Sequence, residues 1–344
     1  MDARQIAVVI TTIQAPTECM RITAERVRRH GMRLIVIGDK IGPSQYLLPE
    51  ADFFSFDRQR SLSFKLTAML PEGSYARKNL GYLMAMSCGC DPIYETDDDN
   101  HPTDAWDVRE QTIEAATLKP LTDAKWANIY SLFTEGIVWP RGFALEHVSR
   151  SLADDFILTG ESSMLRAPIQ QGLANGSPDV DAIWRLVMDR EVTFNVRPNV
   201  VLAEHVWCPF NAQNTWWWRD AFPLMYLPAT CTFRMTDIYR SFVCHKCLWA
   251  MGLRLEFHQA DVKQLRNQHN LMHDFELELQ GYRRNGELVE LLESSEGVTA
   301  NRSLNENIRT CYELLVRHKF LEMRELAMLD AWLEDCESLR GVAS

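Results

Sequence analysis

The chain has 344 residues, of which 46% are hydrophobic and 24% are charged. That composition is typical of a globular protein with one or two domains and a sizeable core, and it excludes wholesale disorder. The formal net charge of −11 repels a phosphate backbone, so we expect no nucleic-acid partner. A local basic pocket for a small phosphorylated ligand is compatible with this average charge.

The cysteines and the apolar segments indicate a compartment. Nine cysteines, an odd number, are scattered along the chain, which is typical of a reducing environment rather than of a disulfide framework. The apolar run near the N-terminus is too short for a signal peptide, and no segment reaches the roughly 18 apolar residues of a membrane span. We therefore expect a cytoplasmic protein without a transmembrane segment.

The first forty residues predict a β-α-β unit. Residues 6–13 (IAVVITTI) are apolar and β-branched, as in a strand buried on both faces. Thr17 is placed to cap a helix that ends at Gly31, and residues 33–39 predict a second buried strand. Such a unit indicates a parallel sheet with a right-handed crossover.

The next predicted helix covers residues 75–89, and residues 92–95 (PIYE) predict another strand. In open α/β sheets, ligands bind outside the carboxyl ends of the strands. We therefore expect the loops after Ile13, Ile37 and Glu95 to open onto one site.

Three adjacent carboxylates, Asp97, Asp98 and Asp99, follow the strand at residues 92–95. Asp97 and Asp99 form a D-x-D pair, whose hard oxygen ligands suit Mg²⁺ or Mn²⁺ held together with substrate phosphates. A solvated acidic turn is the alternative. Arg77 and Lys78, near the start of the preceding helix, favour a bound anion, and their alternative is a solvated helix face.

The rest of the chain changes in character near residue 236. From about residue 125 to 235 we predict mixed strands and long loops. After residue 236 we predict helices, over residues 237–252, 262–282 and 305–339, because apolar residues recur there at a spacing of three to four.

Seven segments, in chain order, resemble the STELLO-type glycosyltransferase-like family, which is known from plants and also occurs in microbes. They run from residue 8 to about residue 275, and are VVITTIQAPT, VIGDKIGP, LPEGSYARKNLGYLMAM, IYETDDDN, DVDAIWRL, PFNAQNTWW and MTDIYRSFVCHKCLWAMG. A weaker resemblance, mostly around the triple aspartate, is to the reversibly glycosylated polypeptides that act as UDP-arabinopyranose mutases. Plant STELLO proteins carry an N-terminal membrane anchor, and we expect this chain to be a free-standing version without one.

The STELLO resemblance implies an α/β fold, the GT-A-like, Rossmann-type fold of nucleotide-diphospho-sugar transferases, with a helical C-terminal region. Residues 1–255 would form the catalytic domain, and residues 256–344 a helical extension packed on it. The implied activity is a metal-dependent glycosyltransferase that uses Mn²⁺ or Mg²⁺. It would move a sugar from a nucleotide-sugar donor, most readily a UDP-linked one, to a glycan or other hydroxyl acceptor.

The resemblance also implies a donor site. Thr11 and Thr12, at the end of the first strand, would hold the nucleoside. Asp39 would accept hydrogen bonds from the base or the ribose. Arg77 and Lys78 would meet the diphosphate.

The acidic cluster would complete this site. Asp97 would lie near ribose or sugar hydroxyls and near the metal, and Asp99 would bind the metal that bridges the two phosphates. Asp98 is the ligand instead if the turn rotates by one residue. His269 shares a helix face with His273 and would be a third metal ligand, a recurring GT-A feature, whereas a polar surface helix is the alternative.

Two other acidic sites have structural alternatives. Asp237 is the candidate for the general base that deprotonates the acceptor hydroxyl, although an aspartate at the start of a helix is commonly a cap. Asp179 and Asp181 either cap the helix that follows or face a sugar.

Two further motifs are unusual. Residues 244–247 (CHKC) lack a second pair of ligands at zinc-site spacing, so we predict one face of a helix rather than a zinc site. Of the three adjacent tryptophans at 216–218, at least one should lie in the core, and we expect one to line the acceptor cleft.

Two other functions remain open. A UDP-sugar mutase would use the same donor site. A non-catalytic scaffold for glycan-synthesising enzymes, or a homo-oligomer, would use the amphipathic helices at residues 305–339 as a docking surface, unless these helices simply pack on the catalytic domain.

Overall fold

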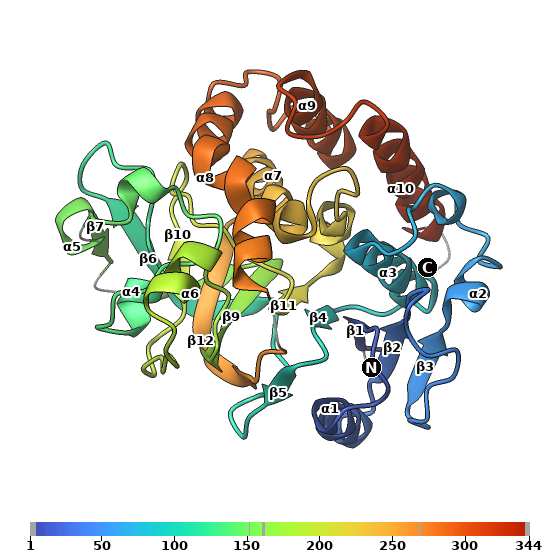
Figure 1. The fold of residues 1–344 in the computed structure, drawn as a ribbon. Helices are drawn as coiled ribbons and strands as arrows, with labels where there is room; N and C mark the ends of the chain where they lie inside the picture. The colour runs from blue at the N-terminus through green and yellow to red at the C-terminus, as the bar shows by residue number, and fades with distance from the viewer. Residues whose placement is uncertain (1–4, 151, 160–161, 268–269, 341–344) are drawn as a thin grey trace.

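The computed structural model describes residues 5–150, 152–159, 162–267 and 270–340 (Figure 1). In these residues one mixed sheet runs through the molecule, so the predicted α/β class is confirmed. In spatial order the strands are β3 (Ala51–Phe54), β2 (Arg33–Ile37), β1 (Ala7–Thr11), β4 (Ile93–Thr96), β11 (Asn214–Trp217), β9 (Ile169–Gly176), β12 (Leu255–Gln264), β10 (Val200–Leu202), β6 (Thr112–Pro120) and β7 (Phe156–Leu158), with β5 (Asn100–Pro102) beside β12 and β8 (Ser163–Arg166) beside β6. The α-helices are α1 (Glu18–Arg29), α2 (Phe56–Gln59), α3 (Lys78–Ser87), α4 (Tyr130–Phe133), α5 (Leu152–Asp155), α6 (Ala182–Val187), α7 (Thr236–Ala250), α8 (Leu271–Glu293), α9 (Leu304–Arg317) and α10 (Glu325–Arg340).

The predicted β-α-β unit is confirmed, because β1 pairs in parallel with both β2 and β4. Thr17 caps α1 by accepting a hydrogen bond from the backbone N–H of Met20. Gly31 follows the end of α1 with a φ of 64°, a conformation that glycine adopts without strain. Alternate residues of β1 belong to separate cores: Val8 packs with α1 and Val9 with α3, on opposite faces of the sheet (Figure 1).

The predicted helix at residues 75–89 is also present. It begins as a 3-10 turn, Tyr75–Arg77, capped by the Ser74 side chain, and continues as α3. Gly81 lets α3 approach the sheet closely, because a Cβ there would lie 2.5 Å from Val9 Cγ1. The helix therefore rests directly on β1.

The tryptophan run forms β11 and the residue after it. Trp216, Trp217 and Trp218 are all buried, and none of them is among the described residues that line the large cleft, so the prediction of a cleft-facing tryptophan is wrong. The cause is that β11 lies inside the sheet, between β4 and β9, where both faces are covered. Trp217 Nε1 donates a hydrogen bond to Glu95, which also forms a buried ion pair with Arg240 at 2.7 Å.

The C-terminal part differs from the prediction in one element. Residues 262–264 were expected in a helix but belong to β12, which pairs with β9 and β5. The helix α8 begins only at Leu271, where the Asn270 side chain accepts a hydrogen bond from the backbone N–H of His273. After α7 the chain therefore becomes helical again only at residue 271, and residue 255, the last of the predicted catalytic domain, is the first residue of β12.

The C-terminal helices pack on the rest of the chain through buried carboxylates. Glu325 accepts hydrogen bonds from the Tyr226 hydroxyl at 2.6 Å and from the Thr230 backbone N–H at 2.8 Å. Asp335 accepts from the backbone N–H of Leu66 at 3.0 Å. In the described residues, no helix is both long enough and apolar enough to cross a membrane.

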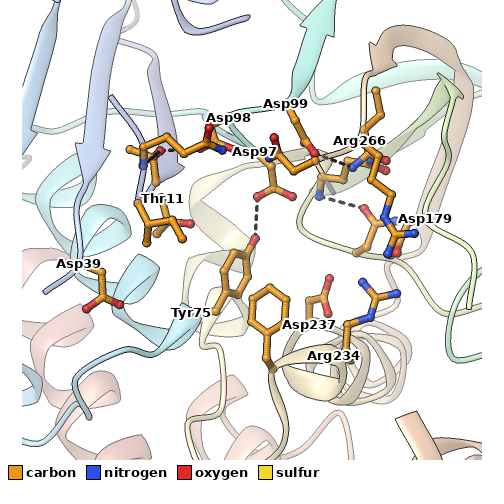
Figure 2. Close-up of a pocket in the computed structure, with 18 of the residues that line it drawn as sticks. Thr11, Asp39, Tyr75, Asp97, Asp98, Asp99, Asp179, Arg234, Asp237 and Arg266 are labelled. Carbon is orange, nitrogen blue, oxygen red and sulfur yellow. Dashed lines mark hydrogen bonds between the residues drawn. The ribbon is translucent and has the colours of Figure 1, made fainter. Parts of the chain in front are cut away.

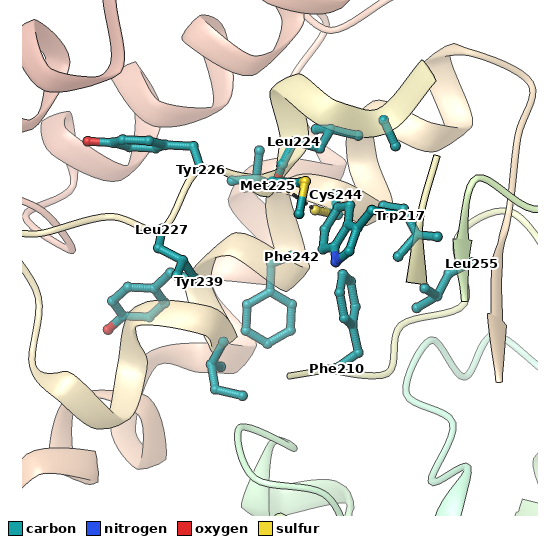
Figure 3. Close-up of a cluster of buried hydrophobic side chains, with 14 of the residues drawn as sticks. Phe210, Trp217, Leu224, Met225, Tyr226, Leu227, Tyr239, Phe242, Cys244 and Leu255 are labelled. Carbon is teal, nitrogen blue, oxygen red and sulfur yellow. Dashed lines mark hydrogen bonds between the residues drawn. The ribbon is translucent and has the colours of Figure 1, made fainter. Parts of the chain in front are cut away.

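The helix α7 lies at the centre of the main hydrophobic core (Figure 3). Figure 3 shows Phe242 of α7 in the same core as Phe210 and Trp217 of β11, whose ring centroids lie 5.9 Å apart. Cys244 and Cys247 are buried on the same helix, so the helix predicted for residues 244–247 is confirmed.

Candidate active site

A cleft of about 670 Å³ opens at the carboxyl ends of β1, β2 and β4. Its lining contains two kinds of charged side chain. The carboxylates are Asp39, Asp97, Asp98, Asp99, Asp179 and Asp237, and the guanidinium groups are Arg77, Arg141, Arg185, Arg234 and Arg266. Figure 2 shows Asp39 and Thr11 at one end of this cleft, Arg234 and Arg266 at the other, and Asp97 between them.

The nucleoside end of the predicted donor site is built from the loops after β1 and β2. The Thr12 hydroxyl donates a hydrogen bond to Asp98 Oδ2, which joins the end of β1 to the acidic turn after β4. Asp39 Oδ1 accepts from the backbone N–H of Gly73 at 3.0 Å. Thr11, Thr12 and Asp39 all line the cleft, so the structure brings these predicted residues together.

Lys78 lies beneath the acidic turn rather than in the cleft lining. Its ammonium group is 3.0 Å from Asp97 Oδ1 and 2.8 Å from the carbonyl oxygen of Thr96. The Tyr75 hydroxyl accepts a hydrogen bond from Lys78 and donates one to Asp97 Oδ1, both at 2.9 Å. Lys78 and Tyr75 therefore compensate the charge of Asp97 and fix its position.

Arg77 lines the cleft but is held by the chain itself. It is buried, and its Nε donates to Gln59 Oε1 at 2.7 Å. Gln59 in turn donates to the carbonyl oxygen of Gly38, at the end of β2. Burial lowers the pKa of Arg77 below its ordinary value of 12.5. Its guanidinium group is thus held by the chain in the cleft wall beside the end of β2.

Asp98 and Asp99 are carboxylates whose ionisation is costly. Burial and, second, the charge of Asp97 together raise the pKa of Asp99 to about 7. Burial also raises the pKa of Asp98, despite the hydrogen bond from Thr12. A bound cation would favour the charged form of both groups, and the turn therefore has the electrostatic character of a cation site.

The donor set is suited to a metal that takes only part of its coordination from protein. Within the described part of the chain, no three His, Cys, Asp or Glu side chains are arranged to hold a metal ion by themselves. Mg²⁺ and related ions are commonly held by one or two carboxylates together with water and substrate phosphates. Asp97, Asp98 and Asp99 fit that pattern. The predicted third ligand, His269, lies outside the described residues.

Arg141 links two carboxylates on the opposite side of the cleft. It forms two 2.8 Å hydrogen bonds with Asp179, and its Nη2 lies 2.8 Å from Asp237 Oδ2. Burial raises the pKa of Asp237, but the charge and hydrogen bonds of Arg141 outweigh it, so this pKa lies below its usual range. Asp237 is therefore an ionised group in the cleft lining. It does not cap α7, whose N-cap position is Met235.

The second acidic pair divides between the two roles considered for it. Asp181 caps α6 by accepting a hydrogen bond from the backbone N–H of Trp184 at 2.8 Å. Asp179 instead faces the cleft and holds Arg141.

Sequence reasoning missed the arginines at this end of the site. Arg234 pairs with Glu278 at 2.6 Å, and Arg266 pairs with Asp274 at 2.7 Å. Arg185 lies on α6 and lines the same cleft. Arg185 lies within the family-like segment DVDAIWRL, and Arg234 immediately precedes the segment that begins MTDIYR. Their location in or beside these segments was the one sequence signal for a role in the site, because their spacing matches no binding motif.

The protein thus has an α/β fold in which an acidic turn and several arginines line one cleft at the carboxyl ends of the strands, the edge at which such sheets bind ligands. Comparison with known proteins is more specific. The family model described as STELLO glycosyltransferases matches residues 234–342. The predicted resemblance to this family is confirmed by two curated relatives.

Both relatives are from Arabidopsis thaliana. The chain is 29% identical over 268 residues to "Probable glycosyltransferase STELLO2", which covers 71% of this chain and 34% of the relative. It is 28% identical over 265 residues to "Probable glycosyltransferase STELLO1", which covers 71% of this chain and 33% of the relative. The aligned region is thus about a third of the length of each relative.

Proposed function

We propose that the protein is a metal-dependent glycosyltransferase that uses a nucleotide-sugar donor, most readily a UDP-linked one, and a hydroxyl acceptor. The observation that carries this proposal is the acidic turn, Asp97 to Asp99, at the carboxyl end of β4 and inside a cleft with the ends of β1 and β2. The similarity to proteins named as probable glycosyltransferases supports the same reaction class.

In this proposal the nucleoside lies at the end formed by Thr11, Thr12 and Asp39. Asp97 and Asp99, or Asp98 in place of one of them, would hold Mn²⁺ or Mg²⁺ beside the diphosphate. The metal would supply positive charge to the leaving diphosphate, as a Lewis acid and a template.

The chain adds fixed positive charge of its own. Arg77, buried against Gln59, would lie under the diphosphate without needing to move during the reaction. Lys78 would act through Asp97, which it holds at 3.0 Å. The arrangement is preorganised, because both cations already have fixed partners.

Asp237 is our candidate for the group that takes the proton from the acceptor hydroxyl. It lies in the cleft lining and is ionised, as a base must be. Its pairing with Arg141 lowers its basicity, so the attacking hydroxyl would have to displace part of that pairing. Arg141 would then orient the carboxylate.

Isothermal titration of UDP and of GDP tests the proposal, with Mn²⁺ or with EDTA, on the wild type and on Asp99→Ala. We expect one nucleotide to bind tightly only when both Mn²⁺ and Asp99 are present. The matched control is Asp123→Ala, which removes an exposed carboxylate outside the cleft. Absence of nucleotide binding by the wild type under every condition would overturn the proposal.

A further inference from the structure

Arg185 is a buried cation whose hydrogen-bonding capacity is largely unused. Its residue is 5% exposed, and it lines the cleft. Its Nη2 donates to the carbonyl oxygen of Pro178 at 2.5 Å, but its Nε has no hydrogen-bond partner among the described residues. Burying a guanidinium donor without a partner is costly, so a ligand group that accepts its hydrogen bonds would restore what burial removes.

Arg185 also lacks the ion pair that the neighbouring arginines have. Arg234 pairs with Glu278 and Arg266 pairs with Asp274, whereas in the described part of the chain no carboxylate lies within ion-pair distance of Arg185. The carboxylates of Asp179 and Asp189 attract Arg185 only from further away.

The three arginines act on one another. Burial and then the charge of Arg266 lower the pKa of Arg185 to about 10. Burial and then the charge of Arg234 lower the pKa of Arg266. An anion placed among these cations would relieve their repulsion, and a planar guanidinium fork suits a carboxylate or a phosphate.

This group lies away from the nucleoside end of the cleft. Figure 2 shows Arg234 and Arg266 on the far side of Asp97 and Tyr75 from Thr11 and Asp39. A nucleotide placed at Thr11 and Asp39, with its diphosphate at the acidic turn, would therefore leave the arginine end of the cleft for the other substrate.

We propose that Arg185, Arg234 and Arg266 form a second anion subsite, which binds a carboxylate or phosphate group carried by the acceptor. This assignment rests on the proposed function for the orientation of the donor. It predicts selection for acidic acceptors, because a neutral acceptor would leave the guanidinium charge of Arg185 without a counter-charge in the cleft.

The test is titration of inorganic phosphate and, separately, of D-glucuronate, with glucose as the neutral comparison. Each titration is done on the protein alone and on the protein saturated with UDP and Mg²⁺, so that UDP occupies the donor site. The variants are Arg185→Met and Arg185→Lys, and Arg197→Met is the control because Arg197 is exposed and outside the cleft. A cooperative thermal unfolding transition, with a midpoint close to that of the wild type, shows that each variant folds.

We expect at least one of the two anions to bind to the UDP-saturated wild type, and glucose not to bind. Arg185→Met should weaken that binding by about tenfold to a hundredfold, which is the range for losing a charge-assisted hydrogen-bonded contact. Arg185→Lys should lose less affinity for the anion, since lysine keeps the positive charge, and Arg197→Met should bind the anion as tightly as the wild type. Whichever of phosphate and glucuronate binds more tightly identifies the acidic group.

Several results would overturn the inference. If the wild type binds neither phosphate nor glucuronate, the proposed subsite does not exist. A loss of UDP affinity in Arg185→Met equal to its loss of anion affinity would assign Arg185 to the donor diphosphate. An Arg185-dependent preference for UDP-glucuronate over UDP-glucose would place the acidic group on the transferred sugar. Failure of the wild type to bind UDP, with Arg185-dependent anion binding retained, would overturn the proposed donor site but not the anion subsite.

Discussion

Replacing Asp99 by asparagine should stabilise the ligand-free protein at pH 8. Burial and the charge of Asp97 hold the pKa of Asp99 at about 7, above its ordinary 3.8. The folded state therefore binds a proton more tightly than the unfolded state between these two pH values. The contribution of Asp99 to stability is complete below about pH 4 and is lost as the pH rises through 7. Asparagine is uncharged, so the variant does not suffer this loss.

The size of the effect follows from the pKa. Ionising a carboxyl group with a pKa of about 7 instead of 3.8 costs about 4 kcal/mol, at about 1.4 kcal/mol for each tenfold change in the ionisation constant. Asp99 is half-buried and lines an open cleft, so solvent screening reduces this figure, and we expect about 2 to 4 kcal/mol. Gln264, which donates to Asp99 Oδ2 at 3.1 Å, can turn its amide to accept from the new side chain.

Urea unfolding of the wild type and Asp99→Asn at pH 4.5, 6 and 8 measures the difference directly. The variant should gain stability relative to the wild type as the pH rises, while losing metal-dependent binding of UDP. Asp123→Asn, which removes an exposed carboxylate, should show neither change. Equal stability of wild type and Asp99→Asn at pH 8 would refute the claim that ionised Asp99 lacks a compensating cation in the ligand-free protein.

Two other substitutions test an ion-pair group that lines the cleft and the packing of α3 on β1. Arg141→Met leaves Asp179 and Asp237 without their shared cation, so we expect a loss of about 3 to 5 kcal/mol at pH 7 in urea unfolding. That loss should shrink in acid. The ion pair of Asp237 with Arg141 stabilises the folded state fully above the ordinary pKa of 3.8, and this stabilisation disappears as the pH falls through the lowered pKa of Asp237. Gly81→Ala should cost about 1 to 3 kcal/mol in thermal unfolding despite the better helix propensity of alanine, because its Cβ would lie 2.5 Å from Val9 Cγ1. An unchanged midpoint would mean that α3 can shift away from β1 at little cost.

The parts of the fold that could be predicted are those governed by nearby residues. The strand at residues 6–13, the Thr17 cap and the glycine after α1 lie within about one β-α-β unit, where periodicity and capping rules apply. The acidic turn follows the same logic, since a strand end places Asp97 to Asp99 at the ligand-binding edge.

The errors come from long-range pairing. Residues 262–264 form a strand because β9 and β5 pair with them, and both partners are distant in the sequence. The tryptophans alternate along β11, but strands on both sides and cores on both faces bury all three of Trp216 to Trp218. Periodicity indicates which residues share a face, but not whether that face is covered.

The arginine group was beyond prediction for a related reason. Arg185 is on α6, Arg234 lies just before α7, and Arg266 follows β12. Three elements separated by dozens of residues must pack correctly before these side chains share a cleft. Each arginine alone has the ordinary interpretation of a surface cation, and only their proximity gives them another.

A single residue, Ala212, connects the acidic turn to the side of the cleft that holds Asp237 and Arg141. The carbonyl oxygen of Ala212 accepts a hydrogen bond from Lys78 at 3.2 Å, and its N–H donates to Asp237 Oδ2 at the same distance. Lys78 also forms an ion pair with Asp97, and Asp237 forms one with Arg141. The charges therefore alternate in sign along these connected groups. Each of these charges is paired with the next, which holds the groups at fixed positions without a bound ligand. The cleft can therefore present preorganised charge to the two proposed substrates, and Asp99 and Arg185 are among the groups without such compensation that we expect a ligand to complete.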